Sequence, residues 1–133
     1  GALQNPTYRN HEGHTEAVRV IYDPTRVTYA RLLRHFWRHH DALDASGQFC
    51  DRGPSYAPAI FVTPAQRAEA EASLAETERT LGRDVATPIR AAAQFWRAEE
   101  YHQDYYQKNA VQYRYYRWRC GRDARVAEIW RGH

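Results

Sequence analysis

Hydrophobic positions recur with two different periods in the first third of the chain. Val18, Val20 and Tyr22 alternate with Arg19 and Ile21, which is the period of a half-buried strand. An apolar stripe at helical spacing then follows Thr28 and consists of Tyr29, Leu32, Leu33, Phe36 and Trp37. Because threonine is a preferred N-cap residue, we predict that a helix begins directly after Thr28 and packs on a sheet.

The pattern changes over residues 41–58, which show no sustained period and contain Gly47, Gly53 and Pro54. Such a stretch predicts a long functional loop. A short buried strand is expected at Ala59–Val62, and a helix with Thr63 as its N-cap is expected to end near Gly82.

The last third of the chain gives weaker signals. Thr87–Ile89 is a candidate strand, and Tyr101–Asn109 predicts a short helix whose tyrosines belong to the core. From Ala110 onward, aromatic and basic residues interleave as they would on a strand with its aromatic side chains inside. Strands and helices that share one sheet indicate an α+β fold with two layers.

Composition supports one globular domain over residues 1–133. The chain is 43% hydrophobic and 14% aromatic. It has no apolar run of the roughly 18 residues that a membrane-spanning helix needs, so we expect no membrane association. The net charge of +3 is concentrated at the end: residues 111–133 hold six arginines against Asp123 and Glu128, a balance of +4, which leaves −1 for the rest.

The candidate chemistry begins in the segment 5–24, NPTYRNHEGHTEAVRVIYDP, where Tyr8, His14 and Glu16 lie on a loop before the first predicted strand. A phenol and a carboxylate on one loop can hold an oxyanion and donate a proton. Together with GQFCDRGPSYAPAIF (47–61) and YHQDYYQKN (101–109), this segment resembles the type A peptide methionine sulfoxide reductases. These enzymes reduce the S epimer of methionine sulfoxide. The three segments keep the family's order.

The resemblance implies a ferredoxin-like core with long loops, and a reaction that uses thiols. A thiolate attacks the sulfoxide sulfur, becomes a sulfenic acid and is then joined by a second thiol in a disulfide. In this comparison Glu16 is the proton donor. Tyr8 and Tyr56 hydrogen-bond the sulfoxide oxygen, and Asp51 orients it through water.

Other residues are expected to support that site. His14 and His102 are candidates for contacts behind the catalytic side chains. For Glu16 to act as an acid near neutral pH, burial beside Ala17 and Val18 would have to raise its pKa.

The family's nucleophile is a cysteine in a Gly-Cys-Phe-Trp motif ahead of the Asn-Pro-Thr-Tyr segment, and the 133 residues do not contain that motif. The chain begins at Gly1 and has no methionine. We therefore expect a fragment that lacks the first strand and helix of its domain and is inactive alone. The alternative is a pseudoenzyme that binds oxidised methionine without reducing it.

Two cysteines are too few for a disulfide framework and suit a reducing, cytoplasmic compartment. Cys120 lies between Arg119 and Arg122, which would lower the pKa of its thiol. It resembles the family's C-terminal recycling cysteine, so we expect it to resolve the sulfenic acid from a mobile tail, with thioredoxin as reductant. Cys50 is interpreted as a small apolar residue at a pocket edge, and a second redox thiol stays open as the alternative.

Two further patterns do not indicate a binding site. His35 and His39 share a helix face but lack a third ligand, so no metal or other cofactor is predicted. The aromatic residues among the tail arginines would also suit single-stranded nucleic acid, but an aromatic-in strand explains them as well. The expected partners are methionine sulfoxide and thioredoxin, with no nucleic acid, and the chain is expected to be a monomer.

Overall fold

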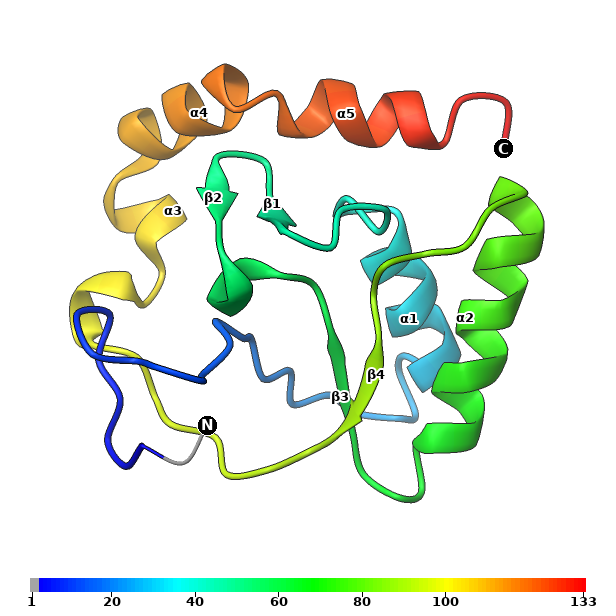
Figure 1. Cartoon of the computed structure of the whole chain (residues 1–133), viewed down its shortest axis with the longest axis horizontal. Helices are drawn as coiled ribbons and strands as arrows, with labels where there is room; N and C mark the ends of the chain where they lie inside the picture. Colours follow the sequence, from blue (N-terminus) through cyan, green and yellow to red (C-terminus); the bar gives the residue numbers. More distant parts are fainter. Residues whose placement is uncertain (1–2) are drawn as a thin grey trace.

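The computed structural model describes residues 3–133, and Figure 1 shows how their helices and strands are arranged. Two short two-stranded sheets are present, one antiparallel and one parallel. In chain order the elements are α1 (Tyr29–Trp37), β1 (Gly47–Gln48), β2 (Asp51–Arg52), a 3₁₀ turn at Pro54–Tyr56, β3 (Ile60–Val62), α2 (Arg67–Leu81), β4 (Ile89–Ala91), a 3₁₀ turn at Glu100–His102, α3 (Tyr105–Lys108), α4 (Ala110–Arg119) and α5 (Arg122–Ile129). The α+β prediction is confirmed. Among residues 3–133, no helix has both the length and the apolar composition that crossing a bilayer would require.

The core lies between the parallel pair β3–β4 and the helices α1 and α2. Ile60 of β3 pairs with Ile89 of β4, and α2 is the crossover that parallel neighbours need. Figure 1 shows α1 and α2 side by side next to this pair. The buried apolar residues that fill the space are Leu33, Trp37, Ala42, Ile60, Val62 and Ala70.

Helix α1 follows its sequence signals. The side-chain oxygen of Thr28 accepts a hydrogen bond from the backbone N–H of Arg31 at 3.1 Å, so the predicted N-cap is confirmed. The apolar stripe faces the core, where Leu33 and Trp37 are buried. The indole N–H of Trp37 donates to the hydroxyl of Ser73 on α2 at 2.9 Å, which joins the two helices.

Helix α2 begins later than predicted. Thr63 does not cap it; instead Thr63 and Gln66 close a turn in which the Thr63 N–H donates to the side chain of Gln66. The helix therefore starts at Arg67. Its end is as predicted, because Gly82 adopts the left-handed conformation that terminates a helix.

The first predicted strand is not formed. Residues 17–22 are extended, but among residues 3–133 they pair with no strand. Val18 is 88% exposed and Ile21 is 87% exposed, so the alternation does not separate a buried from a solvated face. The physical reason is that a strand is stabilised by its neighbour's hydrogen bonds, which period alone does not provide.

The tail is helical, not strand-like. Helices α4 and α5 run across one end of the molecule, above the β1–β2 hairpin in Figure 1. The strand interpretation failed because alternation and helical spacing cannot be told apart when almost every residue is aromatic or basic. The tyrosines at 101, 105 and 106 were expected in the core, but all three are exposed.

A buried histidine predicts how stability should depend on pH. His40 has Nδ1 2.7 Å from the Phe36 carbonyl oxygen and Nε2 3.1 Å from the Thr87 hydroxyl. Burial lowers the pKa of His40 from 6.5 to about 4, although the Phe36 hydrogen bond and the nearby Asp41 carboxylate oppose the shift. On acidification, His40 is therefore protonated at a higher pH in the unfolded chain than in the folded protein. The stabilisation is complete above pH 6.5 and is lost as pH falls towards 4.

We expect this residue alone to cost about 2 kcal/mol of unfolding free energy at pH 5 relative to pH 8. Urea denaturation at several pH values measures it. His40→Asn is the control, because it removes this proton while leaving every other titrating group in place. Equal pH dependence in the two proteins would show that His40 does not resist protonation.

Candidate active site

Tyr8 and Glu16 meet on the N-terminal loop. The Tyr8 hydroxyl donates a hydrogen bond of 2.7 Å to Oε1 of Glu16. A tight turn closed by Thr7 and Asn10 places the phenol, and the Glu16 N–H donates to the carbonyl oxygen of Ser55 at 2.7 Å. The second contact ties the loop to the 3₁₀ turn Pro54–Tyr56, although the two are far apart in the sequence.

The β1–β2 hairpin and the turn after it bring in the other two predicted residues. Asp51 lies in β2, and Tyr56 ends the 3₁₀ turn. Gly47 pairs with Arg52 at a positive φ of 154°, and a Cβ there would collide with the carbonyl oxygen of Asp51. Glycine is therefore required for the close approach that sets the position of Asp51.

Two phenols are held protonated near two carboxylates. Burial raises the pKa of Tyr8 above its usual range, and the hydrogen bond to Glu16 adds to the effect. Burial also raises the pKa of Tyr56, with further contributions from the charges of Glu16 and Asp51. Both hydroxyls are therefore available as hydrogen-bond donors at neutral pH.

Sequence reasoning missed Glu99 as a member of this cluster. Its carboxylate accepts from the Tyr8 N–H at 3.3 Å and from the Tyr101 hydroxyl at 2.9 Å. Its neighbour His102 stacks on the Tyr8 ring with centroids 3.5 Å apart. The available signal was the position of Glu99 three residues before His102, directly ahead of the segment 101–109 that carries the resemblance. Nε2 of His102 is buried and has no hydrogen-bond partner among residues 3–133.

The two histidines expected behind the site differ in their contacts. His102 stacks on the Tyr8 ring, whereas Nε2 of His14 lies 2.7 Å from the carbonyl oxygen of Leu3. The expected shielding of Glu16 is absent, because Glu16, Ala17 and Val18 are all exposed. This part of the acid hypothesis is corrected: the two apolar neighbours do not bury the carboxyl group.

The two cysteines are joined in a disulfide, with Cα atoms 5.4 Å apart. Cys50 occupies the hairpin between β1 and β2, and Cys120 follows α4. The interpretation of Cys50 as a small apolar residue at a pocket edge is therefore wrong, because Cys50 is bonded to Cys120 and is exposed. Sequence could not pair two cysteines that are 70 positions apart, because only the docking of α4 brings them together.

Helix α5 holds the end of the chain in place, which corrects the expectation of a mobile tail. The Arg125 guanidinium donates to the buried carboxylate of Asp41 at 2.9 Å, and Arg122 donates to the carbonyl oxygen of His39 at 3.1 Å. The indole N–H of Trp130 donates to the carbonyl oxygen of Trp37 at 3.1 Å.

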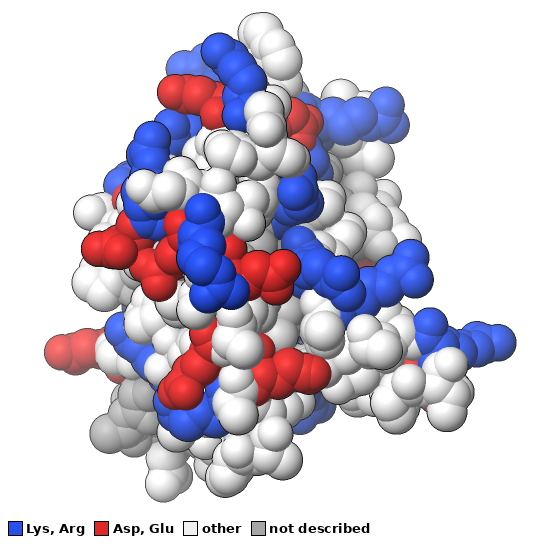
Figure 2. Space-filling model, turned by 90° about the vertical axis from the view of Figure 1, so that its right-hand side faces the viewer, with Lys and Arg blue, Asp and Glu red and all other residues white. Residues whose placement is uncertain are grey.

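Charge is mixed rather than concentrated on the face shown in Figure 2, where acidic and basic side chains lie among one another. Ion pairs neutralise part of the arginine excess at the end of the chain. Arg117 contacts Asp123 at 2.9 Å, and Arg125 contacts both Asp41 and Glu128.

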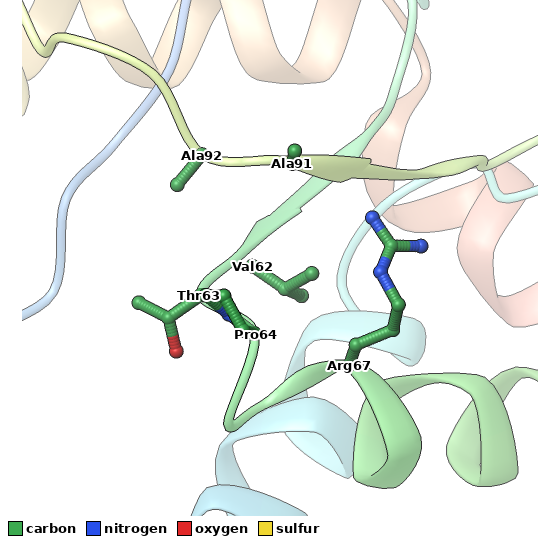
Figure 3. A pocket seen from close by; sticks show the side chains of 6 residues that line it. All are labelled: Val62, Thr63, Pro64, Arg67, Ala91 and Ala92. Atoms are coloured by element: carbon green, nitrogen blue, oxygen red, sulfur yellow. The ribbon is translucent and has the colours of Figure 1, made fainter.

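One shallow cavity is separate from the candidate active site. It has a volume of about 390 Å³ and lies at the ends of β3 and β4 beside the start of α2 (Figure 3). Its lining consists of Val62, Thr63, Pro64, Arg67, Ala91 and Ala92, which include none of the predicted site residues. Among residues 3–133, no three histidine, cysteine or acidic side chains are grouped closely enough to bind a metal ion.

The fold and the site together define an α+β protein with a phenol–carboxylate cluster and a pair of cysteines joined in a disulfide. The family model described as peptide methionine sulfoxide reductase matches residues 1–133. A relative named peptide methionine sulfoxide reductase MsrA 2, from Caulobacter vibrioides, is 52% identical over 137 residues, which cover 99% of this chain and 70% of the relative. The chain therefore belongs to the peptide methionine sulfoxide reductase family.

Solved structures agree with this assignment. Mxr1 from Saccharomyces cerevisiae in its reduced form aligns with a TM-score of 0.64 at 33% identity, covering 67% of this chain and 50% of that one. Methionine sulfoxide reductase A of Corynebacterium diphtheriae aligns with a TM-score of 0.62 at 31% identity, covering 80% and 58%. The chain thus spans about half the length of these solved relatives.

Proposed function

We propose that this chain forms the oxygen-binding and proton-donating side of an enzyme that reduces the S epimer of methionine sulfoxide, free or in proteins. The hydrogen bond between Tyr8 and Glu16 carries the proposal, because it places a phenol donor and a carboxyl group against one another. Tyr56 lies within electrostatic reach of both Glu16 and Asp51.

In the proposed reaction, Tyr8 and Tyr56 donate hydrogen bonds to the sulfoxide oxygen and Asp51 orients it through water. A thiolate attacks the sulfur, Glu16 delivers a proton to the oxygen, and the oxygen ends on the cysteine as a sulfenic acid. The resemblance assigns that thiolate to a Gly-Cys-Phe-Trp motif, which is not among the 133 residues.

The second half of the reaction is assigned to the paired cysteines. The Cys120 thiolate attacks the sulfenic acid sulfur, and the displaced hydroxide takes up a proton and leaves as water. The Cys50 thiolate then attacks the Cys120 sulfur of this mixed disulfide, which forms the Cys50–Cys120 disulfide and releases the first cysteine as a thiolate. Thioredoxin then supplies two electrons and two protons that return both thiols. The disulfide and the exposure of Cys50 support this route. A cytoplasmic location and a monomeric state are part of the same proposal.

The test uses a chimera in which a family segment containing Gly-Cys-Phe-Trp precedes Gly1. With racemic methionine sulfoxide and dithiothreitol, we expect the S epimer alone to disappear, as followed by chiral chromatography. Tyr8→Phe combined with Tyr56→Phe should lower kcat/KM by roughly two orders of magnitude or more, the scale of a lost oxyanion hole donor.

Tyr105→Phe is the matched control, because Tyr105 is an exposed phenol on α3 and is not one of the four proposed residues. Its activity should equal that of the unmodified chimera. Consumption of both epimers at equal rates, or full activity in the double variant, would contradict the proposed site.

A further inference from the structure

A single 3₁₀ turn brings two side chains to Tyr8 from a distant part of the sequence. The turn spans Glu100–His102, and the His102 N–H donates to the carbonyl oxygen of Glu99 at 3.0 Å. Side chains three residues apart in such a turn face the same side, and here both reach Tyr8. Figure 1 shows this yellow segment against the dark blue loop that carries Tyr8.

Glu99 holds the backbone of Tyr8. Its two carboxylate oxygens accept the Tyr8 N–H at 3.3 Å and 3.5 Å, and Oε2 also accepts from the Tyr101 hydroxyl at 2.9 Å. Although burial opposes the shift, the hydrogen bonds from Tyr101 and from the Tyr8 N–H lower the pKa of Glu99, and the nearby His102 acts in the same direction. The carboxylate is therefore charged at neutral pH, and a charged acceptor makes the stronger kind of hydrogen bond.

His102 holds the ring of the same tyrosine. The two rings are stacked, with centroids 3.5 Å apart and planes inclined by 19°. At the far end of Tyr8, the hydroxyl donates to Oε1 of Glu16 at 2.7 Å. Tyr8 is thus held at its backbone, at its ring face and at its hydroxyl, and only the last of these contacts lies within its own loop.

The contacts from the 3₁₀ turn are better protected from water than the contact within the loop. The hydrogen bond between Tyr8 and Glu16 is exposed, so water competes for both partners. The hydrogen bond between the Tyr8 N–H and Glu99 is partly buried, and the side chains of Tyr8, Glu99 and His102 are all half-buried. The position of the phenol therefore depends more on the distant turn than on Glu16.

We infer that Glu99 is a positioning residue for Tyr8: through the backbone N–H, it keeps the phenol hydroxyl where it meets Glu16. The inference rests on the proposed function only for its catalytic consequence, because the proposed role of that hydroxyl is to bind the sulfoxide oxygen. Glu99 itself exchanges no proton with the substrate. Side chains around a reacting group must be held by their own supporting contacts, and Glu99 supplies such a contact from outside the loop.

The first arm of the test uses the 133-residue protein with ¹³C-labelled tyrosine and no substrate. The Cζ resonance of Tyr8, assigned with Tyr8→Phe, reports the hydrogen bond that its hydroxyl donates, and Glu16→Ala gives the resonance position when that bond is absent. Glu99→Ala should move the resonance most of the way to this position, although Glu99 contacts the other end of Tyr8. Glu99→Gln should stay close to the unmodified protein, because its amide oxygen can still accept the N–H.

Glu100→Ala is the matched control, because this adjacent carboxylate pairs with Arg97 and Lys108 instead. It should leave the Cζ resonance of Tyr8 unchanged. The Asn10 N–H, which donates within the loop's own turn, should keep its protection from hydrogen exchange in Glu99→Ala. An unmoved Cζ resonance in Glu99→Ala would overturn the inference. Loss of Asn10 protection would also overturn it, because Glu99 would then maintain the loop as a whole.

The second arm uses the chimera and combines Glu99→Ala with Tyr8→Phe. With Tyr8 present, Glu99→Ala should lower kcat/KM by up to about a hundredfold, the cost of a displacement near 1 Å. In the Tyr8→Phe background it should cause no further loss, because no hydroxyl is left to position. Equal losses in both backgrounds would overturn the inference. A chimera without any reductase activity would contradict the proposed function, whereas the Cζ resonance would still decide whether Glu99 positions Tyr8.

Discussion

Replacement of Glu16 by glutamine in the chimera is expected to slow methionine release in a single turnover by a hundredfold or more. Glutamine can still accept the hydrogen bond from Tyr8, but it cannot deliver a proton to the departing oxygen. A factor of this size is usual for the loss of a positioned general acid. The measurement is rapid quenching of enzyme in excess over substrate, followed by quantification of methionine.

Glu12→Gln is the matched control, because Glu12 is an exposed carboxylate on the same loop. Its single-turnover rate should equal that of the unmodified chimera. The assignment of the acid to Glu16 would be wrong if Glu16→Gln left the rate unchanged across the pH range. In that case Asp51 would be the next candidate, since its carboxylate lies in the same cluster.

The second large effect is expected in the core. Trp37→Ala should reduce the free energy of unfolding by about 3–5 kcal/mol, the usual cost of truncating a buried aromatic residue. Trp37 is 1% exposed, packs within the cluster between α1 and α2, and donates to the Ser73 hydroxyl. Truncation leaves a cavity and also removes the donor to the Ser73 hydroxyl, and each of these changes lowers the free energy of unfolding.

Urea denaturation with a fluorescence readout measures this loss. Trp118→Ala is the control, because Trp118 is largely exposed on α4 and its truncation should change stability by less than about 0.5 kcal/mol. If Trp37→Ala lowered the free energy of unfolding by less than about 1 kcal/mol, the contacts of Trp37 between α1 and α2 would not be important for the stability of the core.

Local signals were sufficient wherever the structure of a segment depends on its own residues. The cap at Thr28, the stripe that buries Leu33 and Trp37, and the left-handed end at Gly82 all follow from short-range geometry. The pairing of Tyr8 with Glu16 belongs to the same class, since one loop carries both and the turn closed by Thr7 and Asn10 sets their approach. The family resemblance predicted the roles of Tyr8 and Glu16, and the local turn accounts for the hydrogen bond between them.

Other features depended on segments that are distant in the sequence. Residues 17–22 have a strand's period but no partner among residues 3–133, so pairing was not determined by the pattern. The contact of Glu99 with Tyr8 arises only when the C-terminal third folds back over the first half. No local rule predicts such contacts.

The sequence by itself determined the family, the α+β class, the two central helices and the four side chains proposed for catalysis. The tertiary structure alone decided that the tail is two helices, that α5 is fixed by Asp41 and the carbonyl groups after α1, and that Cys50 and Cys120 are bonded. The reason is that hydrogen-bond caps and helical stripes act over a few residues. A disulfide across 70 positions forms only after packing has brought its two ends together.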